Sequence, residues 1–178
     1  MNLPLNLLPV VGRVWRFLCL ALILPASGWS MIGTPSLLAD GGEGSFPLVA
    51  GGSAAAIHVS TEDWTGVLRA ARDLQADVEQ VTGVKPDLAT TGAASGPAVV
   101  IVGTVGKSAL IDGLVAAGKL DVSAIRGKWE AFQIEVVNAP MPGVDRALVI
   151  AGSDKRGTIY GIYEVSEQIG VSPWYWWA

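Results

Sequence analysis

The chain has 178 residues, which is the length of one domain. It is 51% hydrophobic and 16% charged, which is typical of a globular protein and excludes an intrinsically disordered chain. Its net charge of −4 argues against nucleic acid as a partner, because binding to a phosphate backbone needs an excess of positive charge.

The first 30 residues have the pattern of a signal peptide. Two arginines precede the apolar run 17–24, and Pro25 with several small residues follows it. A membrane-spanning helix needs about 20 apolar residues, so no stable membrane anchor is expected. We predict a signal peptide over residues 1–30 and a secreted or periplasmic protein. The sole cysteine, Cys19, lies in this segment, so the exported chain has no disulfide.

Residues 31–45 are rich in Gly, Ser and Pro, which predicts a flexible leader before a domain over residues 46–170. The elements expected in chain order are strands at 46–50 and 55–60, a helix from Asp63 to Gly83, strands at 87–90 and 98–102, a helix at 107–117, a helical turn at 121–127, strands at 131–137 and 146–151, and a helix at 155–169. Asp63 is expected to cap the first helix and Gly83 to end it. The unbroken apolar run 98–102 predicts a strand buried on both faces. This order predicts an α/β fold (an α+β sandwich), with a mixed β-sheet packed against helices.

The segment IVGTVGKS, residues 101–108, is similar to a phosphate-binding P-loop. The P-loop needs a glycine five positions before the Gly-Lys pair, and Ile101 stands there. We therefore expect a tight turn between a strand and a helix. Lys107 and Ser108 would then lie at a helix N-terminus, where an anionic group can be bound.

A second loop, GSDKRG at residues 152–157, has the same strand-loop-helix pattern. Ser153 or Asp154 is expected to cap the helix. Lys155 and Arg156 fall in its first turn, where the helix dipole disfavours positive charge. An anionic partner or a facing carboxylate would account for them, and Arg156 suits a carboxylate well.

Other ionisable side chains indicate no site. His58, the sole histidine, alternates with apolar residues on an expected strand and is predicted to be packed or on the surface. Glu130, Glu135, Glu164 and Glu167 are expected on solvated faces. No metal-binding cluster can be built around one histidine, so neither a metal nor a cofactor is expected.

The chain ends on Trp174, Tyr175, Trp176 and Trp177. Each aromatic side chain buries roughly 150–250 Å² when it packs, so together they offer a large apolar surface. Such a surface marks an interface or a missing partner. We predict that residues 171–178 form an aromatic junction to a further domain, with a tail folded onto its own core as the alternative.

Four segments together carry a family resemblance: AARDLQADVEQVTGVKP, IVGTVGKSALID, KWEAFQIEVV and AGSDKRGTIYGIYEVSEQIGVSPWYWWA. They resemble the N-terminal domain of glycoside hydrolase family 115, the α-glucuronidases that remove glucuronic acid or 4-O-methylglucuronic acid branches from xylan. The resemblance covers residues 46–178. It implies an α/β domain that precedes a catalytic (β/α)₈ barrel.

The resemblance also implies roles for parts of this chain. The catalytic carboxylates belong to the barrel, so no catalytic residue is expected here and the chain alone is expected to be inactive. Glucuronoxylan or its oligosaccharides would be bound through the full-length enzyme, and the missing barrel would be the partner of the junction. The implied substrate-binding residues are Lys107, Ser108, Asp154, Lys155 and Arg156, as positioning groups.

Two other readings stay open at this point. One is a stand-alone carbohydrate-binding module that uses Trp174, Trp176 and Trp177 as a stacking platform for sugar rings. The other, which Ile101 disfavours, is a nucleotide-binding protein.

Overall fold

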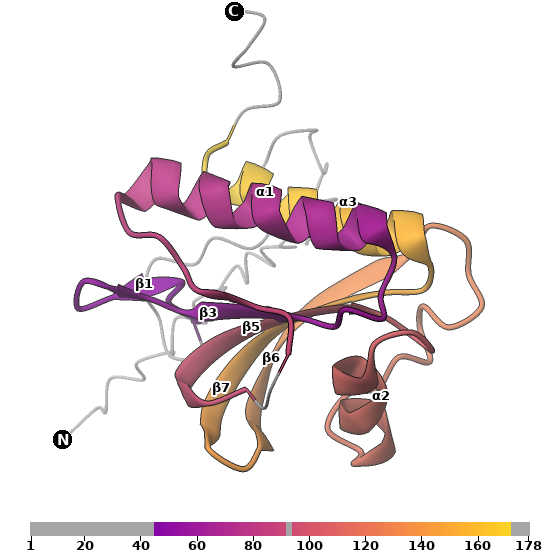
Figure 1. The fold of residues 1–178 in the computed structure, drawn as a ribbon. Coiled ribbons are helices and arrows are strands. Elements are labelled where there is room, and N and C mark those ends of the chain that lie inside the picture. The colour runs from indigo at the N-terminus through magenta and orange to yellow at the C-terminus, as the bar shows by residue number, and fades with distance from the viewer. Residues whose placement is uncertain (1–44, 92–93, 172–178) are drawn as a thin grey trace, which may run out of the picture. The chain divides into compact units, whose positions relative to one another are not determined.

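The computed structural model describes residues 45–91 and 94–171, which form a mixed β-sheet covered by helices on both faces (Figure 1). The bounds of the elements in this part are β1 Val49–Ala50, β2 Ser53–Ala54, β3 Ala56–Val59, α1 Thr65–Thr82, β4 Leu88–Ala89, β5 Gly96–Thr104, α2 Ala109–Ala116, β6 Phe132–Met141, β7 Val144–Gly152 and α3 Lys155–Gln168. β1 and β2 form a short antiparallel pair, and the other five strands form one sheet in the order β4-β3-β5-β7-β6. The α/β fold predicted from the sequence is confirmed.

The centre of the sheet is β5, with β3 and β7 parallel to it on either side. Residues 99–102 are fully buried, as the unbroken apolar run predicts for a strand covered on both faces. β6 runs antiparallel to β7, so the expected hairpin is present. Its strands are longer than predicted, because Pro140 and Met141 still belong to β6 and the turn is confined to Pro142 and Gly143.

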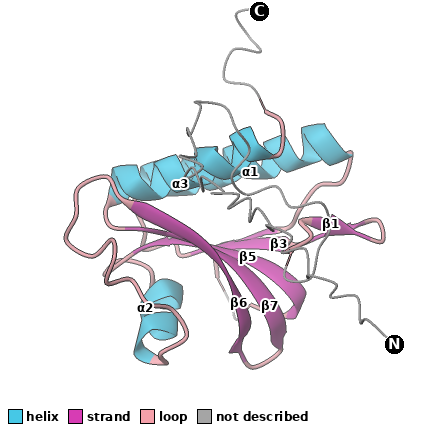
Figure 2. Cartoon of the chain, turned by 180° about the vertical axis from the view of Figure 1, so that it is seen from behind, coloured by secondary structure: helices cyan, strands magenta, loops and turns pink. Residues whose placement is uncertain are grey.

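Each face of the sheet has its own core. Helices α1 and α3 pack side by side over one face, and α2 lies over the other (Figures 1 and 2). The core beneath α1 and α3 includes Ile57, Val100, Ile150, Leu74 and Ile162. The core beneath α2 includes Val99, Ile101, Val149, Ile111 and Leu114. The alternation of neighbouring strand residues between the two cores follows from the period of two along a strand.

Some local expectations are corrected. Asp63 does not cap α1: the N-cap is Trp64, which makes no side-chain capping bond. Asp63 is instead 6% exposed and binds across to Thr104. Gly83 does end the helix, with the left-handed φ of 74° that glycine adopts at low cost. The expectation of a helical turn at 121–127 is met: residues 123–127 are turns, and the Arg126 N–H donates to the Val122 carbonyl four positions earlier at 2.8 Å, as in a single helical turn.

The expectations for residues 1–30, for the leader up to residue 44 and for the aromatic residues Trp174 to Trp177 lie outside the described residues. Within residues 45–91 and 94–171, no helix has both the length and the apolar character needed to cross a bilayer.

The connections after β5 and β7 define one special position in the sheet. These two strands are parallel neighbours. The chain leaves β5 towards α2 on one face, whereas it leaves β7 towards α3 on the other face (Figure 1). Ligand sites in open α/β sheets lie where two neighbouring strands send their connections to opposite faces, at the carboxyl ends of the strands. The fold therefore places a crevice at the ends of β5 and β7.

Candidate functional site

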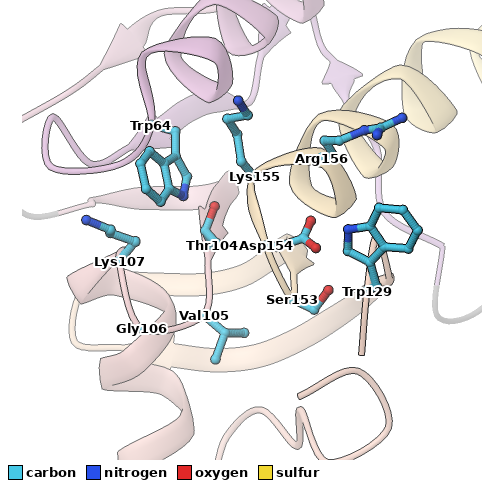
Figure 3. Close-up of a pocket in the computed structure, with 10 residues that line it drawn as sticks. All are labelled: Trp64, Thr104, Val105, Gly106, Lys107, Trp129, Ser153, Asp154, Lys155 and Arg156. Atoms are coloured by element: carbon cyan, nitrogen blue, oxygen red, sulfur yellow. The ribbon is translucent and has the colours of Figure 1, made fainter. Parts of the chain in front are cut away.

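An open pocket of about 460 Å³ lies at this position (Figure 3). Its lining comes from the loop after β5, the loop after β7, the start of α1 and the segment before β6. The lining residues are Trp64, Thr104, Val105, Gly106, Lys107, Trp129, Ser153, Asp154, Lys155 and Arg156. Both strand-loop-helix segments singled out in the sequence thus meet at one place.

The β5 side of the pocket is held by a buried hydrogen-bond network. The Asp63 carboxylate accepts the backbone N–H of Thr104 at 2.7 Å and its hydroxyl at 2.8 Å. The Thr104 hydroxyl lies 2.8 Å from that of Thr158 in α3. The network joins the residue before the N-cap of α1, the end of β5 and the first turn of α3, and so forms a fixed floor.

The loop after β5 is compact because a glycine allows close contact. A Cβ on Gly103 would lie 2.3 Å from the Cβ of Ser108, so only glycine lets the start of α2 pack onto the strand end. Ser108 is fully buried and is the N-cap of α2. Lys107 points outward, and its Nζ lies 4.5 Å from the centre of the Trp64 ring, which is a cation–π contact.

The β7 side depends on Asp154, the N-cap of α3. Its Oδ1 accepts the N–H of Gly157 at 2.8 Å, and its Oδ2 accepts the N–H of Glu130 at 2.9 Å. These backbone donors lower the pKa of the Asp154 carboxyl. Ser153 adds two further bonds to the backbone of Ala131. The segment before β6 is therefore attached to the start of α3.

Arg156 has a facing carboxylate, which is one of the two explanations that its place in the first turn of α3 suggests. Its guanidinium forms an ion pair with Glu130 at 2.7 Å and donates to the Tyr160 hydroxyl at 2.6 Å. The expectation that Glu130 lies on a solvated face is wrong, because its side chain is only 23% exposed. Sequence reasoning missed the pairing because 26 positions separate the two residues.

Four of the five expected binding residues line this pocket: Lys107, Asp154, Lys155 and Arg156. The fifth, Ser108, is absent from the lining and is the buried N-cap of α2. His58 is 6% exposed within β3, and burial lowers its pKa. In the part of the chain that the structure describes, no three His, Cys, Asp or Glu side chains are grouped to hold a metal ion.

Two pocket residues, Trp64 and Trp129, are not among those that the sequence pattern singled out. Trp64 is 43% exposed and Trp129 is 80% exposed. Figure 3 shows them on opposite sides of the pocket, with Thr104 and Asp154 between them. Each is a single large aromatic residue in a polar segment, one after a strand end and one before a strand. That context was the available signal.

Comparisons with known proteins show a likeness to a solved structure. No protein-family model matches the chain, and no curated protein matches it. Among solved structures it is similar to a family GH115 4-O-methyl-α-glucuronidase described as specific for decorated arabinogalactans, with 35% sequence identity and a TM-score of 0.58. The match covers 72% of this chain and 15% of that protein. The chain thus has a GH115-like α/β fold and is related to part of a glycoside hydrolase.

Proposed function

We propose that this chain is the N-terminal α/β domain of an exported α-glucuronidase, which removes glucuronic acid or 4-O-methylglucuronic acid branches from a polysaccharide such as xylan. The likeness to a GH115 4-O-methyl-α-glucuronidase at 35% identity is the observation that carries the proposal. The chain spans about 15% of that protein's length. The domain itself is proposed to be inactive, with the catalytic carboxylates contributed by a barrel that follows it.

The pocket at the ends of β5 and β7 is proposed to help position the uronate carboxylate. Lys107 and Lys155 bring positive charge to its lining, and neither forms an ion pair within residues 45–91 and 94–171. The nearby carboxylate of Asp154 is already satisfied by backbone N–H groups. A general acid for glycoside cleavage must hold a proton at the leaving oxygen, and a carboxyl with a lowered pKa is poorly suited to that. The pocket therefore supports binding and orientation as its role.

The test is an activity assay on the complete protein that the gene encodes. Release of 4-O-methylglucuronic acid is measured from glucuronoxylan and from decorated arabinogalactan. We expect release from at least one polymer. Absence of release from both, by a folded protein, would contradict the proposed function.

A second measurement tests the role of the pocket within that enzyme. Lys107→Met keeps a side chain of similar length without the charge, and we expect kcat/KM to fall about tenfold, as for the loss of one charge-assisted contact. Lys119→Met is the matched control, because Lys119 is exposed and absent from the pocket lining. If both variants have wild-type kcat/KM, the pocket does not position the substrate.

A further inference from the structure

We propose that Trp64 and Trp129 are the two aromatic walls of a subsite for a single uronate sugar ring, with Lys107 as the partner of its carboxylate. The choice of a uronate rests on the proposed function. The two indoles come from different parts of the fold, the start of α1 and the segment before β6. They lie on opposite sides of the pocket, with a polar floor between them (Figure 3).

The exposure of these two side chains points to a ligand. Besides them, the large hydrophobic side chains exposed in the described part of the chain are Val81, Tyr160 and Tyr163. Each tyrosine has a partner for its hydroxyl, Arg156 for Tyr160 and Asp73 for Tyr163. Trp129 is 80% exposed on a pocket rim, where an indole gains most by covering an apolar ligand face. The C–H face of a pyranose ring is such a surface.

The backbone that carries Trp129 is held in place by the residue that follows it. Glu130 has a φ of 53°, in the left-handed region that is costly for a side chain other than glycine or asparagine. Two contacts maintain this conformation: its N–H donates to Asp154 at 2.9 Å, and its carboxylate pairs with Arg156 at 2.7 Å. Backbone strain that is held by specific contacts is typical of functional sites. Glu130 and Arg156 are thus positioning residues for the backbone from which Trp129 projects.

The positive charge of the pocket lining favours an acidic sugar over a neutral one. The Nζ of Lys107 lies over one face of the Trp64 ring, 4.5 Å from its centre, so the sugar stacks on the other face and its carboxylate reaches the ammonium group past the edge of the indole. Arg156 is paired with Glu130, whereas Lys107 and Lys155, the other cations of the lining, form no ion pair within the described segments. A volume of about 460 Å³ lies within the range of small-molecule sites, roughly 300–1,000 Å³. A sugar ring with a carboxylate can stack on the two indoles and also form an ion pair with Lys107.

The binding test is an NMR titration of the protein with methyl α-D-glucuronide. The indole N–H signals of Trp64 and Trp129 are assigned from Trp64→Phe and Trp129→Phe. We expect saturable shifts of both signals at millimolar ligand, and binding of neutral methyl α-D-glucoside about tenfold weaker. Lys107→Met should remove this preference. Absence of saturable shifts, or equal binding of the two glycosides, would overturn the subsite.

Three variants separate the proposed walls from general effects. Trp129→Ala should weaken glucuronide binding about tenfold, within the range of losses for a stacked aromatic contact. Glu130→Gln should weaken binding several-fold although both indoles remain, and it should also shift the Trp129 signal in the free protein. Val81→Ala, an exposed apolar residue outside the pocket lining, should bind as the wild type does. Wild-type affinity for Trp129→Ala would contradict the proposal.

Adenosine monophosphate serves as a competing probe, because a base also stacks on indoles and a phosphate also meets lysine. Saturable shifts with this nucleotide and none with the glucuronide would replace the sugar subsite with a nucleotide site.

The result of the NMR titration is independent of the result of the activity assay. If the complete protein releases glucuronic acid but the indole signals do not shift with glucuronide, only the proposed subsite is contradicted. If the indole signals shift but no glucuronic acid is released, only the proposed function is contradicted.

Discussion

The carboxylate of Asp63 binds Thr104 at two points, accepting its backbone N–H at 2.7 Å and its hydroxyl at 2.8 Å. Both residues are almost completely buried, at 6% and 2% exposure. They lie 41 positions apart, one after β3 and one at the end of β5. This contact sets the position of the pocket floor relative to Trp64, which follows Asp63 directly in the chain.

Replacement of Asp63 by alanine should destabilise the fold. The buried N–H of Thr104 would lose its acceptor, at a cost of about 1–3 kcal/mol, and its hydroxyl would keep only Thr158 as a partner, so we expect a total loss of about 2–4 kcal/mol. Urea unfolding measures this loss in the free energy of unfolding. Asp145→Ala removes the same charge at an exposed position and should change stability by less than about 0.5 kcal/mol. Equal losses for the two variants would contradict this account.

Gly157 should not tolerate a side chain. A Cβ at this position would lie 2.2 Å from the carbonyl oxygen of Ala131, and backbone cannot move aside as a side chain can. We expect Gly157→Ala to cost about 2–4 kcal/mol and to displace Trp129, as seen by denaturant unfolding and by the Trp129 indole signal. Gly113→Ala is the matched control in a helix with open space, and should stabilise by about 0.5–1 kcal/mol.

The contribution of Asp154 should depend on pH. Its pKa is lowered in the folded protein, first by the N–H of Gly157 and next by that of Glu130. An aspartate has a pKa of about 3.9 when unfolded, so its stabilising effect is present above about pH 4 and is lost as the pH falls through the lowered pKa. Asp154→Ala should cost about 1–2 kcal/mol at pH 7 and progressively less in acid. Asp154→Asn keeps a capping oxygen and should flatten the pH dependence. A loss for Asp154→Ala that stays constant down to low pH would count against this account.

The Tyr163 hydroxyl should lose its proton at a higher pH than an ordinary tyrosine does. Partial burial and then its hydrogen bond to Asp73, at 2.7 Å, raise its pKa to about 12. The unfolded chain loses this proton near pH 10, so the folded state binds more protons between the two values and stability falls as the pH rises through them. Ultraviolet titration of phenolate should show a late phase that is absent in Tyr163→Phe. Asp73→Asn should lower this pKa more than Asp77→Asn, since Asp77 is the weaker influence. Identical shifts in the two variants would be inconsistent with the contact.

Local pattern was sufficient for much of the fold. The apolar run at 98–102 predicted a strand buried on both faces, and Gly83 predicted the end of α1. Both rest on short-range chemistry, because burial on two faces excludes polar residues and a left-handed cap favours glycine. Short-range chemistry also explains why the prediction for Asp63 is wrong. Its neighbours in the sequence suit a helix cap, but its partner Thr104 is distant in the chain and gives no local signal.

The candidate site was predictable only in part. By itself the sequence determined the two strand-loop-helix segments, and hence Lys107, Asp154, Lys155 and Arg156, since each loop is read from its own few residues. Tertiary structure alone decided that both loops line one pocket, that Glu130 pairs with Arg156, and that Trp64 and Trp129 lie on opposite sides of the pocket. The physical reason is strand pairing: the parallel register of β5 with β7 brings residues about 50 positions apart to the same edge of the sheet.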